Sequence, residues 1–313
     1  MRHRPPWEKH RPGALAPAGL RSYQCPVRPP RPDPIALVLL AHGSTAHRSA
    51  LGRIAPLAAA LATGSPFHPV KAAFWKQAPR IQEVLADLPS DRACIVPLFL
   101  SAGHFAGRVI PQTLGLRMSN GIGMGRAFER DLVYARPLGC HPGLARIAGE
   151  LGRSVLPPET EPAADTALVL AGHGTPRNRR SRRDVETVAA GVRRLGWFAE
   201  VHALFLEEAP RIEDWWRISS RPRVVVIPWT LAEGLHGGED IPVRLGADPA
   251  AVEARLAAKE APWINPTPLH GREVWCTPSL GAAPGLSRLI RELAMEAAAA
   301  ARWLEAKEAA DGE

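Results

Sequence analysis

The sequence predicts an α/β fold of two tandem domains, each a small parallel sheet with helices on both faces. The first observation behind this prediction is an internal repeat, in which His42 recurs as His173, a step of 131 residues. The second is that each copy alternates short apolar runs with amphipathic helical patterns. Strands joined by helices pair in parallel and are buried on both faces, so continuous Val, Ile and Leu runs such as IALVLLA are typical of this fold.

Three pairs of sequence blocks share this step. LVLLAHGST (37–45) recurs as LVLAGHGT (168–175), FWKQAPRI (74–81) as FLEEAPRI (205–212), and PLFLSAGHFAGRVIP (97–111) as PWTLAEGLHGGEDIP (228–242). A fourth pair, PLGCHPGLARI and SLGAAPGLSRLI, follows after 11 extra residues in the second copy. The repeat divides the chain into a Pro/Arg-rich leader (1–33), a first domain (34–154), a linker (155–165) and a second domain (166–313).

The elements of the first copy follow in order from its hydrophobic pattern. Apolar runs predict strands at 35–41, 70–74, 93–99 and 132–135, and helical periodicity predicts helices at about 47–62, 79–88, 107–117 and 142–153. The His-Gly corner after the first strand and the loop after the third strand then lie at the carboxyl edge of the sheet, where ligands bind in such folds. The second copy repeats this order and presents an equivalent edge.

Composition excludes several classes of protein. The 313 residues carry a formal net charge of +8, but the leader alone holds seven Lys/Arg against two Asp/Glu, so the remainder is only mildly basic. We therefore expect a disordered leader, no nucleic-acid partner and, because no apolar run approaches ~20 residues, no membrane partner. The four cysteines include no CxxC pair, which predicts a reducing, cytoplasmic location and no thiolate metal site.

Three side chains of the second copy are candidate metal ligands and catalytic groups. His173 follows its first strand, Glu207 its second and His236 its third, so all three lie at one edge of one sheet. Two imidazoles and a carboxylate suit a divalent transition metal such as Co, Fe, Ni or Zn. A single histidine at a strand end is more often a hydrogen-bonded structural residue, but three candidates at equivalent strand ends favour a metal site.

The first copy keeps less of this set. Counting by the repeat, it has His42 for His173, Lys76 for Glu207, and Phe105 for His236. His104 lies one position before the phenylalanine, and a lysine beside two histidines repels a cation. We therefore expect the working site in the second copy, with the first copy degenerate or a wall of the substrate cleft, and we keep His42 and His104 as further candidate metal ligands.

A run of arginines directly follows the second His-Gly corner. Arginine at a helix start opposes the helix dipole, and the ordinary interpretation of such a run is a solvated helix face. A polycarboxylate substrate would offset both the dipole and the mutual repulsion of the arginines. The candidate substrate-binding residues are Arg177, Arg179, Arg180, Arg182 and Arg183.

No phosphate-binding GxGxxG or GxxxxGK[ST] loop and no GxSxG hydrolase elbow occur in the sequence.

The blocks LAGHGT, LFLEEAPRI and PWTLAEGLHGGEDIP instead resemble the three motifs of the sirohydrochlorin chelatases, the class II chelatases that insert cobalt or iron in cobalamin and siroheme synthesis. The resemblance covers both copies, about residues 35–300, and the long members of this family are likewise built from two such halves.

This resemblance implies a lyase-class chelatase that inserts Co²⁺, or Fe²⁺, into sirohydrochlorin. It places the metal-binding histidines at His173 and His236 and the acidic group at Glu207. In long members the N-terminal half usually holds the working site, whereas here the C-terminal half keeps the motif. The partners it implies are a tetrapyrrole and a divalent metal ion, with no cofactor beyond that substrate metal, and the chain is expected to be a monomer or a homodimer.

The chemistry of metal insertion agrees with these residue types. Two pyrrole N–H protons must leave as the ion enters, and neutral imidazole can bind the ion and accept a proton. The candidates to pack against the ring face are Phe105, Trp215, Trp216 and Trp229, although aromatic residues near strand ends are more often core. The alternative function is a non-catalytic metal- or tetrapyrrole-binding protein, and a weaker one is a hydrolase with a two-histidine metal site.

Overall fold

The computed structural model describes residues 34–43, 49–176, 179–231 and 235–304, and the side chains of 49–53 and 235–237 lie outside that description. The predicted leader (1–33) therefore lies outside it as well. Residues 33–313 form one unit. In the part of the chain that is described, no helix is long and apolar enough to cross a membrane.

The first sheet has six strands in the order β2-β1-β3-β6-β5-β4. β2, β1, β3 and β6 are parallel, as the sequence predicts, and β5 and β4 extend the edge in antiparallel fashion. The strands are β1 (Ile35–Ala41), β2 (Phe67–Phe74), β3 (Arg92–Pro97), β4 (Arg117–Ser119), β5 (Ile122–Ala127) and β6 (Arg130–Tyr134). The helical segments between them are α1 (Ser49–Ala62), α2 (Ile81–Ala86), η1 (Phe105–Val109) and α3 (Ile110–Thr113), followed after β6 by η2 (Leu138–Cys140) and α4 (Leu144–Ser154).

The second sheet repeats this plan with five strands in the order β10-β11-β9-β7-β8. β8, β7, β9 and β11 are parallel, and β10 is antiparallel at the edge. The strands are β7 (Thr166–Gly172), β8 (Glu200–Phe205), β9 (Arg223–Pro228), β10 (Thr267–Leu269) and β11 (Arg272–Cys276). The helical segments are α5 (Pro162–Asp165), α6 (Arg179–Leu195), η3 (Ile212–Asp214), α7 (Trp215–Ile218), η4 (Leu235–Asp240), α8 (Ile241–Leu245), α9 (Pro249–Ala257), η5 (Leu280–Ala282) and α10 (Leu286–Ala300).

Both faces of each sheet are covered, which explains the continuous apolar runs. In β1 the side chains of Leu37 and Leu39 enter one core, and those of Val38 and Leu40 enter the core on the opposite face. β7 alternates in the same way between the first of these cores and a third one beneath α7 and α8. Because successive strand side chains point to opposite faces, every position of such a strand must be apolar.

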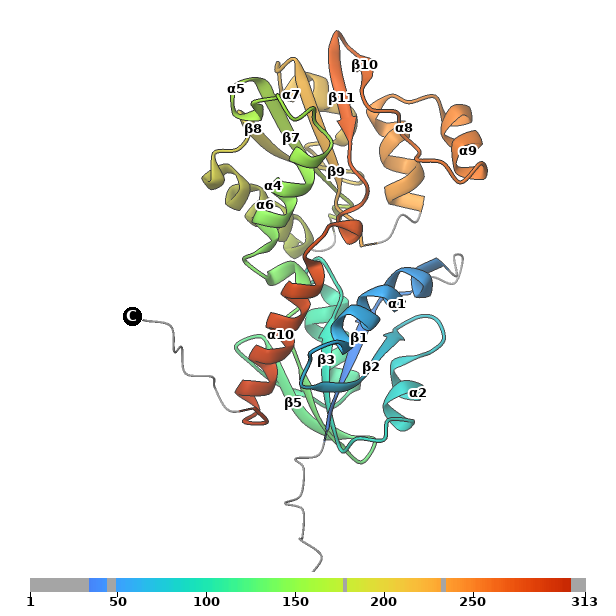
Figure 1. Ribbon diagram of the computed structural model, residues 1–313, viewed down its shortest axis with the longest axis vertical. Coiled ribbons are helices and arrows are strands. Elements are labelled where there is room, and N and C mark those ends of the chain that lie inside the picture. The colour runs from blue at the N-terminus through green and yellow to red at the C-terminus, as the bar shows by residue number, and fades with distance from the viewer. Residues whose placement is uncertain (1–33, 44–48, 177–178, 232–234, 305–313) are drawn as a thin grey trace, which may run out of the picture. The chain divides into compact units, whose positions relative to one another are not determined.

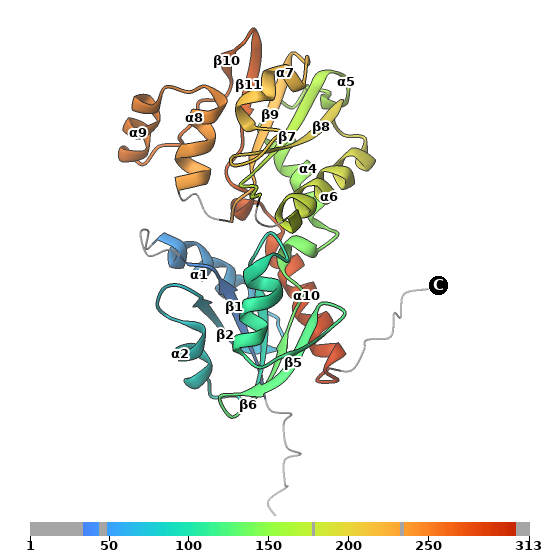
Figure 2. The ribbon, with the colours of Figure 1, turned by 180° about the vertical axis from the view of Figure 1, so that it is seen from behind.

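The last helix of each copy packs on the sheet of the other copy (Figures 1 and 2). α4 contacts α6 and β9, where Gly149 and Gly152 leave room for the rings of Trp197 and Phe198. α10 lies against β3 and β6 of the first sheet, and a salt bridge of 2.6 Å joins Glu296 of α10 to Arg136. The two chain segments predicted as domains thus each supply a sheet and exchange their final helices.

Two-residue turns join the antiparallel edge strands. Asn120 and Gly121 (φ +49° and +82°) connect β4 to β5, and His270 and Gly271 (φ +49° and +72°) connect β10 to β11. Positive φ at both central residues is the geometry that matches the twist of a hairpin. The predicted helix at 107–117 is correspondingly shorter: it ends at Thr113, and residues 117–119 form β4 instead.

Candidate metal and tetrapyrrole site

The two His-Gly corners have the same backbone geometry, and each needs its glycine. Gly43 and Gly174 have φ of +74° and +67°, a region that side chains rarely adopt. A Cβ on Gly174 would also lie 2.8 Å from the Cβ of Phe205, and one on Gly43 would lie 2.8 Å from Cγ of Gln77. The glycine therefore lets the chain turn sharply, directly after the histidine, against the end of the next strand.

Backbone hydrogen bonds confirm that the two corners are structural equivalents. The amide of Lys76 donates to the carbonyl oxygen of His42 at 2.9 Å, and the amide of Glu207 donates to that of His173 at 3.0 Å. Each bond ties the end of the first strand of its sheet to the residue that follows the second strand. The residue after the second strand is thereby held beside the histidine in both halves.

In the second half this arrangement brings an imidazole and a carboxylate together. Nε2 of His173 lies 3.4 Å from Oε1 of Glu207, and both side chains are about half exposed (44% and 51%). The neighbouring Glu208 points elsewhere, because its carboxylate accepts a hydrogen bond of 2.9 Å from the amide of Thr175. The predicted pair His173 and Glu207 therefore meets, open to solvent, at the carboxyl edge of the second sheet.

The third predicted ligand, His236, belongs to η4, a π-helical turn, and its side chain lies outside the described residues. Among the described side chains, no three His, Cys, Asp or Glu residues form a group able to hold a metal ion. The role of His236 as the third metal ligand therefore stays a prediction. π-helical turns inside α-helices are rare and are frequent at functional sites, and η1 provides one at the equivalent place in the first half.

In the first half an aromatic ring occupies the space beside the histidine. Phe105 packs edge-to-face on His42, with ring centroids 5.1 Å apart, and His104 lies 5.5 Å from the same ring on another side. The ammonium of Lys76 sits over Phe105, 5.3 Å from its centroid. The first corner is therefore one aromatic ring surrounded by two imidazoles and a cation, and no carboxylate takes the place of Glu207.

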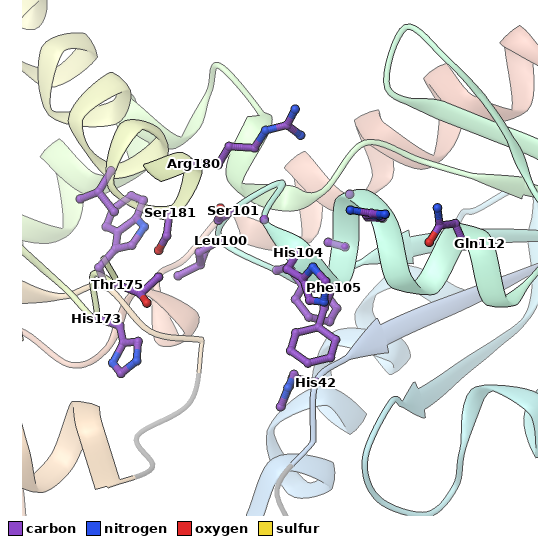
Figure 3. Close-up of a pocket in the computed structure, with 17 residues that line it drawn as sticks. His42, Leu100, Ser101, His104, Phe105, Gln112, His173, Thr175, Arg180 and Ser181 are labelled. Carbon is purple, nitrogen blue, oxygen red and sulfur yellow. The ribbon is translucent and has the colours of Figure 1, made fainter. Parts of the chain in front are cut away.

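Both histidine corners line one pocket of about 1160 Å³ (Figure 3). His42 and Phe105 lie together on one side of it, and His173 and Thr175 lie on the other. Drug-sized ligands occupy pockets of roughly 300–1,000 Å³, so this pocket suits a larger ligand. Its lining also includes Ser101, His104, Arg108, Gln112, Arg180, Ser181 and Trp229.

Arg180 is the predicted substrate-binding arginine that lines the pocket in the described part of the chain. It is the second residue of α6, and its Nη1 lies 3.5 Å from the carbonyl oxygen of Ala102. The amide of the same alanine donates to Oδ2 of Asp184 at 3.0 Å. Helix α6 of the second half thereby holds the loop of the first half that leads into η1.

The other predicted arginines are placed differently. Nε of Arg182 pairs with Glu186 at 2.7 Å and its Nη1 donates to the carbonyl oxygen of Ala209 at 2.9 Å, so this side chain serves local structure. The remaining positions are Arg179 and Arg183, exposed on α6, and Arg177, which lies outside the described residues.

Three pocket residues carry a polar role that the sequence-based prediction missed. The indole Nε1 of Trp229 and the hydroxyl of Ser101 are buried and have no hydrogen-bond partner among the described residues. Arg108 is an exposed guanidinium on η1. The repeat could have drawn attention to Arg108, because the equivalent residue of the second half, 131 positions later, is the oppositely charged Glu239. All three groups donate hydrogen bonds, which suits a ligand rich in acceptors.

Known proteins resemble this chain in sequence over most of its length. The CbiX family model matches residues 36–153 and, a second time, residues 167–297. A probable sirohydrochlorin cobaltochelatase of Halobacterium salinarum is 30% identical over 277 residues, which cover 84% of this chain and 92% of the relative.

Solved structures share the fold. The multi-domain protein DR2241 from Deinococcus radiodurans, described as structurally similar to chelatases, superposes with a TM-score of 0.68 at 25% identity. The match covers 85% of this chain but only 55% of that longer one. SirB from Bacillus subtilis, solved with Fe³⁺, superposes with a TM-score of 0.63 over 86% of this chain and 98% of SirB, and at 18% identity it shows the fold alone.

Proposed function

Because the chain belongs to the CbiX family, we propose that it is a metal chelatase that inserts a divalent ion into sirohydrochlorin. The observation that carries this proposal is the shared pocket: both His-Gly corners line one cavity of about 1160 Å³. A site for a small metal complex alone needs far less room. The cavity matches a macrocycle that must be held while an ion is delivered to its centre.

The polar lining of the pocket supports the same ligand. Arg108 and Arg180 line it, together with the buried donors of Trp229 and Ser101. Carboxylates accept hydrogen bonds and pair with guanidinium groups, and sirohydrochlorin carries carboxylates around its rim. The ring face packs against Phe105, which lines the pocket with its edge toward His42.

His173 and Glu207 act on the incoming ion and on the protons it displaces. The neutral imidazole holds the ion, while the carboxylate 3.4 Å away balances its charge. As the ion enters the ring, two pyrrole N–H bonds are lost, and these two groups accept the protons. His236 completes the donor set in this proposal, and no resident cofactor takes part beyond the substrate metal.

Co²⁺ is the proposed metal, in cobalamin synthesis, because the curated relative that covers most of this chain is named a cobaltochelatase. Fe²⁺, in siroheme synthesis, is the second candidate, since imidazole and carboxylate donors accept both ions. One chain supplies both corners of the pocket, and we propose a monomer as the working unit. We place the reaction in the cytoplasm, in keeping with three described cysteines that form no disulfide.

An insertion assay tests the proposal. Purified protein is mixed under anaerobic conditions with Co²⁺ and an excess of metal-free sirohydrochlorin, and the absorbance of the metallated product is followed. A chelatase turns over many equivalents faster than the reaction without protein. A non-catalytic metal- or tetrapyrrole-binding protein binds one equivalent without acceleration, and that result would contradict the proposal. A parallel assay with Fe²⁺ decides between the two metals.

A further inference from the structure

Three equivalent positions of the two corners differ in charge. Three acidic residues of the second half, Glu207, Glu239 and Asp240, have lysine, arginine and valine at the equivalent positions of the first half, Lys76, Arg108 and Val109. The formal charge of these positions is therefore −3 in the second half and +2 in the first. A corner that merely lost its function would lose its acids without acquiring cations at the same places.

This positive charge lies at the pocket and beside it. Arg108 and Phe105 line the pocket, and the ammonium of Lys76, which is not a lining residue, lies over the phenylalanine ring, 5.3 Å from its centroid. Among the described residues, no carboxylate lies within salt-bridge distance of either cation, whereas Arg182 of the second half is paired with Glu186. Within the described part of the chain, no carboxylate therefore balances these two cations.

Two buried hydrogen-bond donors line the same pocket as Arg108. The Ser101 hydroxyl belongs to the loop before η1, lines the pocket, and has no partner in the described part of the chain. The indole N–H of Trp229 is likewise unpartnered, in a side chain that is 5% exposed. A buried donor without a partner is costly unless a ligand supplies the acceptor.

We infer that the first half has become the carboxylate-binding wall of the pocket, with Lys76 and Arg108 as residues that determine specificity for an anionic macrocycle. The second half keeps the metal corner and adds Arg180 to the lining of the same pocket. This inference rests on the proposed function and names the residues that bind the rim of its substrate. A positive corner also keeps the incoming cation away from His42 and directs it to His173.

Binding of the metal-free substrate tests this division. Metal-free sirohydrochlorin is titrated into the wild-type protein and into Arg108→Met and Lys76→Met, and the quenching of tryptophan fluorescence gives Kd. Methionine keeps an unbranched, apolar stem and removes the charge. Because a charge-assisted hydrogen bond at a half-open site is lost, we expect Kd to rise roughly tenfold for Arg108→Met and a few-fold for Lys76→Met.

Three further measurements make the result specific. Arg117→Met removes an exposed arginine on β4, outside the pocket, and must leave Kd within twofold. Calorimetric titration with Co²⁺ alone must give the same affinity for Arg108→Met and the wild type. A fully esterified, uncharged sirohydrochlorin must bind both proteins equally, because the arginine then has no carboxylate to contact.

The outcomes separate this inference from the proposed function. The carboxylate-binding role is wrong if Arg108→Met binds sirohydrochlorin as tightly as the wild type. It is also wrong if the variant loses affinity equally for sirohydrochlorin and for its uncharged ester. Both results count against the role even when metal insertion is normal. If the wild type binds sirohydrochlorin through Arg108 but never accelerates insertion, the inference stands and the chelatase proposal falls.

Discussion

Gly281 is the residue at which a single methyl group should disturb both the fold and the site. A Cβ at this position would lie 1.9 Å from the carbonyl oxygen of Leu231, 2.4 Å from its carbonyl carbon and 2.7 Å from its Cα. All three are backbone atoms, so no side chain can move aside. The segments must separate by more than about 1 Å to reach an ordinary contact distance of ~3.5 Å.

That separation has a cost that follows from the structure. The amide of Gly281 donates to the carbonyl oxygen of Thr230 at 3.0 Å, and this bond breaks when the segments part. Overpacking costs about 1–3 kcal/mol, and a buried amide without a partner about 1–3 kcal/mol. We expect Gly281→Ala to lower the free energy of unfolding by about 2–5 kcal/mol, and Tm by about 5–10 °C.

The same change should impair metal insertion, because Leu231 leads into η4, the turn that carries His236. Thermal unfolding and the insertion assay measure the two effects. The matched control is Gly64→Ala, where φ is +61° and a Cβ would meet nothing within 4 Å. That variant is destabilised only by the left-handed backbone conformation of its alanine, which costs about 1–2 kcal/mol. If Gly281→Ala unfolds no earlier than Gly64→Ala, the proposed packing of this segment is wrong.

Two further predictions concern charged groups. Desolvation opposes ionisation of Glu200, but hydrogen bonds from Arg221, His202 and Ser219 outweigh it and hold the pKa of Glu200 at about 2. Because this pKa lies below that of the unfolded chain, near ~4.3, the stabilisation is complete above pH ~5 and is lost as the pH falls toward 2. Glu200→Gln should therefore lower the urea midpoint at pH 7, and the difference from wild type should narrow between pH 4.5 and pH 3; a constant difference would refute the ionic origin. Asp184→Ala should cost about 1–3 kcal/mol and raise KM for the tetrapyrrole, since it frees the amide of Ala102 before η1, and an unchanged KM would show that this contact does not position the loop.

The hydrophobic pattern and the repeat together predict most of the fold. The first strand begins and ends at the predicted residues, 35 and 41, because a strand that is buried on both faces must be continuously apolar. The edge hairpin β4–β5 carries a signal that the hydrophobic pattern overlooks: the dipeptide Asn120-Gly121, which favours a two-residue turn. Edge strands that are half exposed and rich in glycine have no continuous apolar run, so the turn dipeptide is the sequence signal that predicts them.

The exchange of the final helices has no equivalent signal. α4 and α10 are both amphipathic, and the apolar stripe of such a helix packs equally well on either sheet. Only the shapes of particular neighbours decide the partner: Gly149 accepts the ring of Trp197, and a Cβ there would lie 2.7 Å from Cε3 of that ring. Packing of this kind between distant segments is not periodic along the chain, so no pattern in the sequence predicts it.

The candidate site was predictable where it depends on the ends of strands. His173 and Glu207 meet because parallel strands place their carboxyl ends at one edge, which the order of elements already implies. The arginines were less predictable, since a helical run points its members in different directions. Arg180 faces the pocket, whereas Arg182, two residues later, turns to Glu186.

The most direct test of the central claim compares the two His-Gly corners in one assay. His173→Ala and His42→Ala are assayed for Co²⁺ insertion into sirohydrochlorin, with circular dichroism and Tm confirming that both variants fold. We predict that His173→Ala loses insertion activity by about 100-fold or more, whereas His42→Ala, at the corner without a carboxylate, stays within about tenfold of the wild type. Normal insertion by His173→Ala together with an inactive His42→Ala would place the metal in the first half and contradict the division of roles between the two corners.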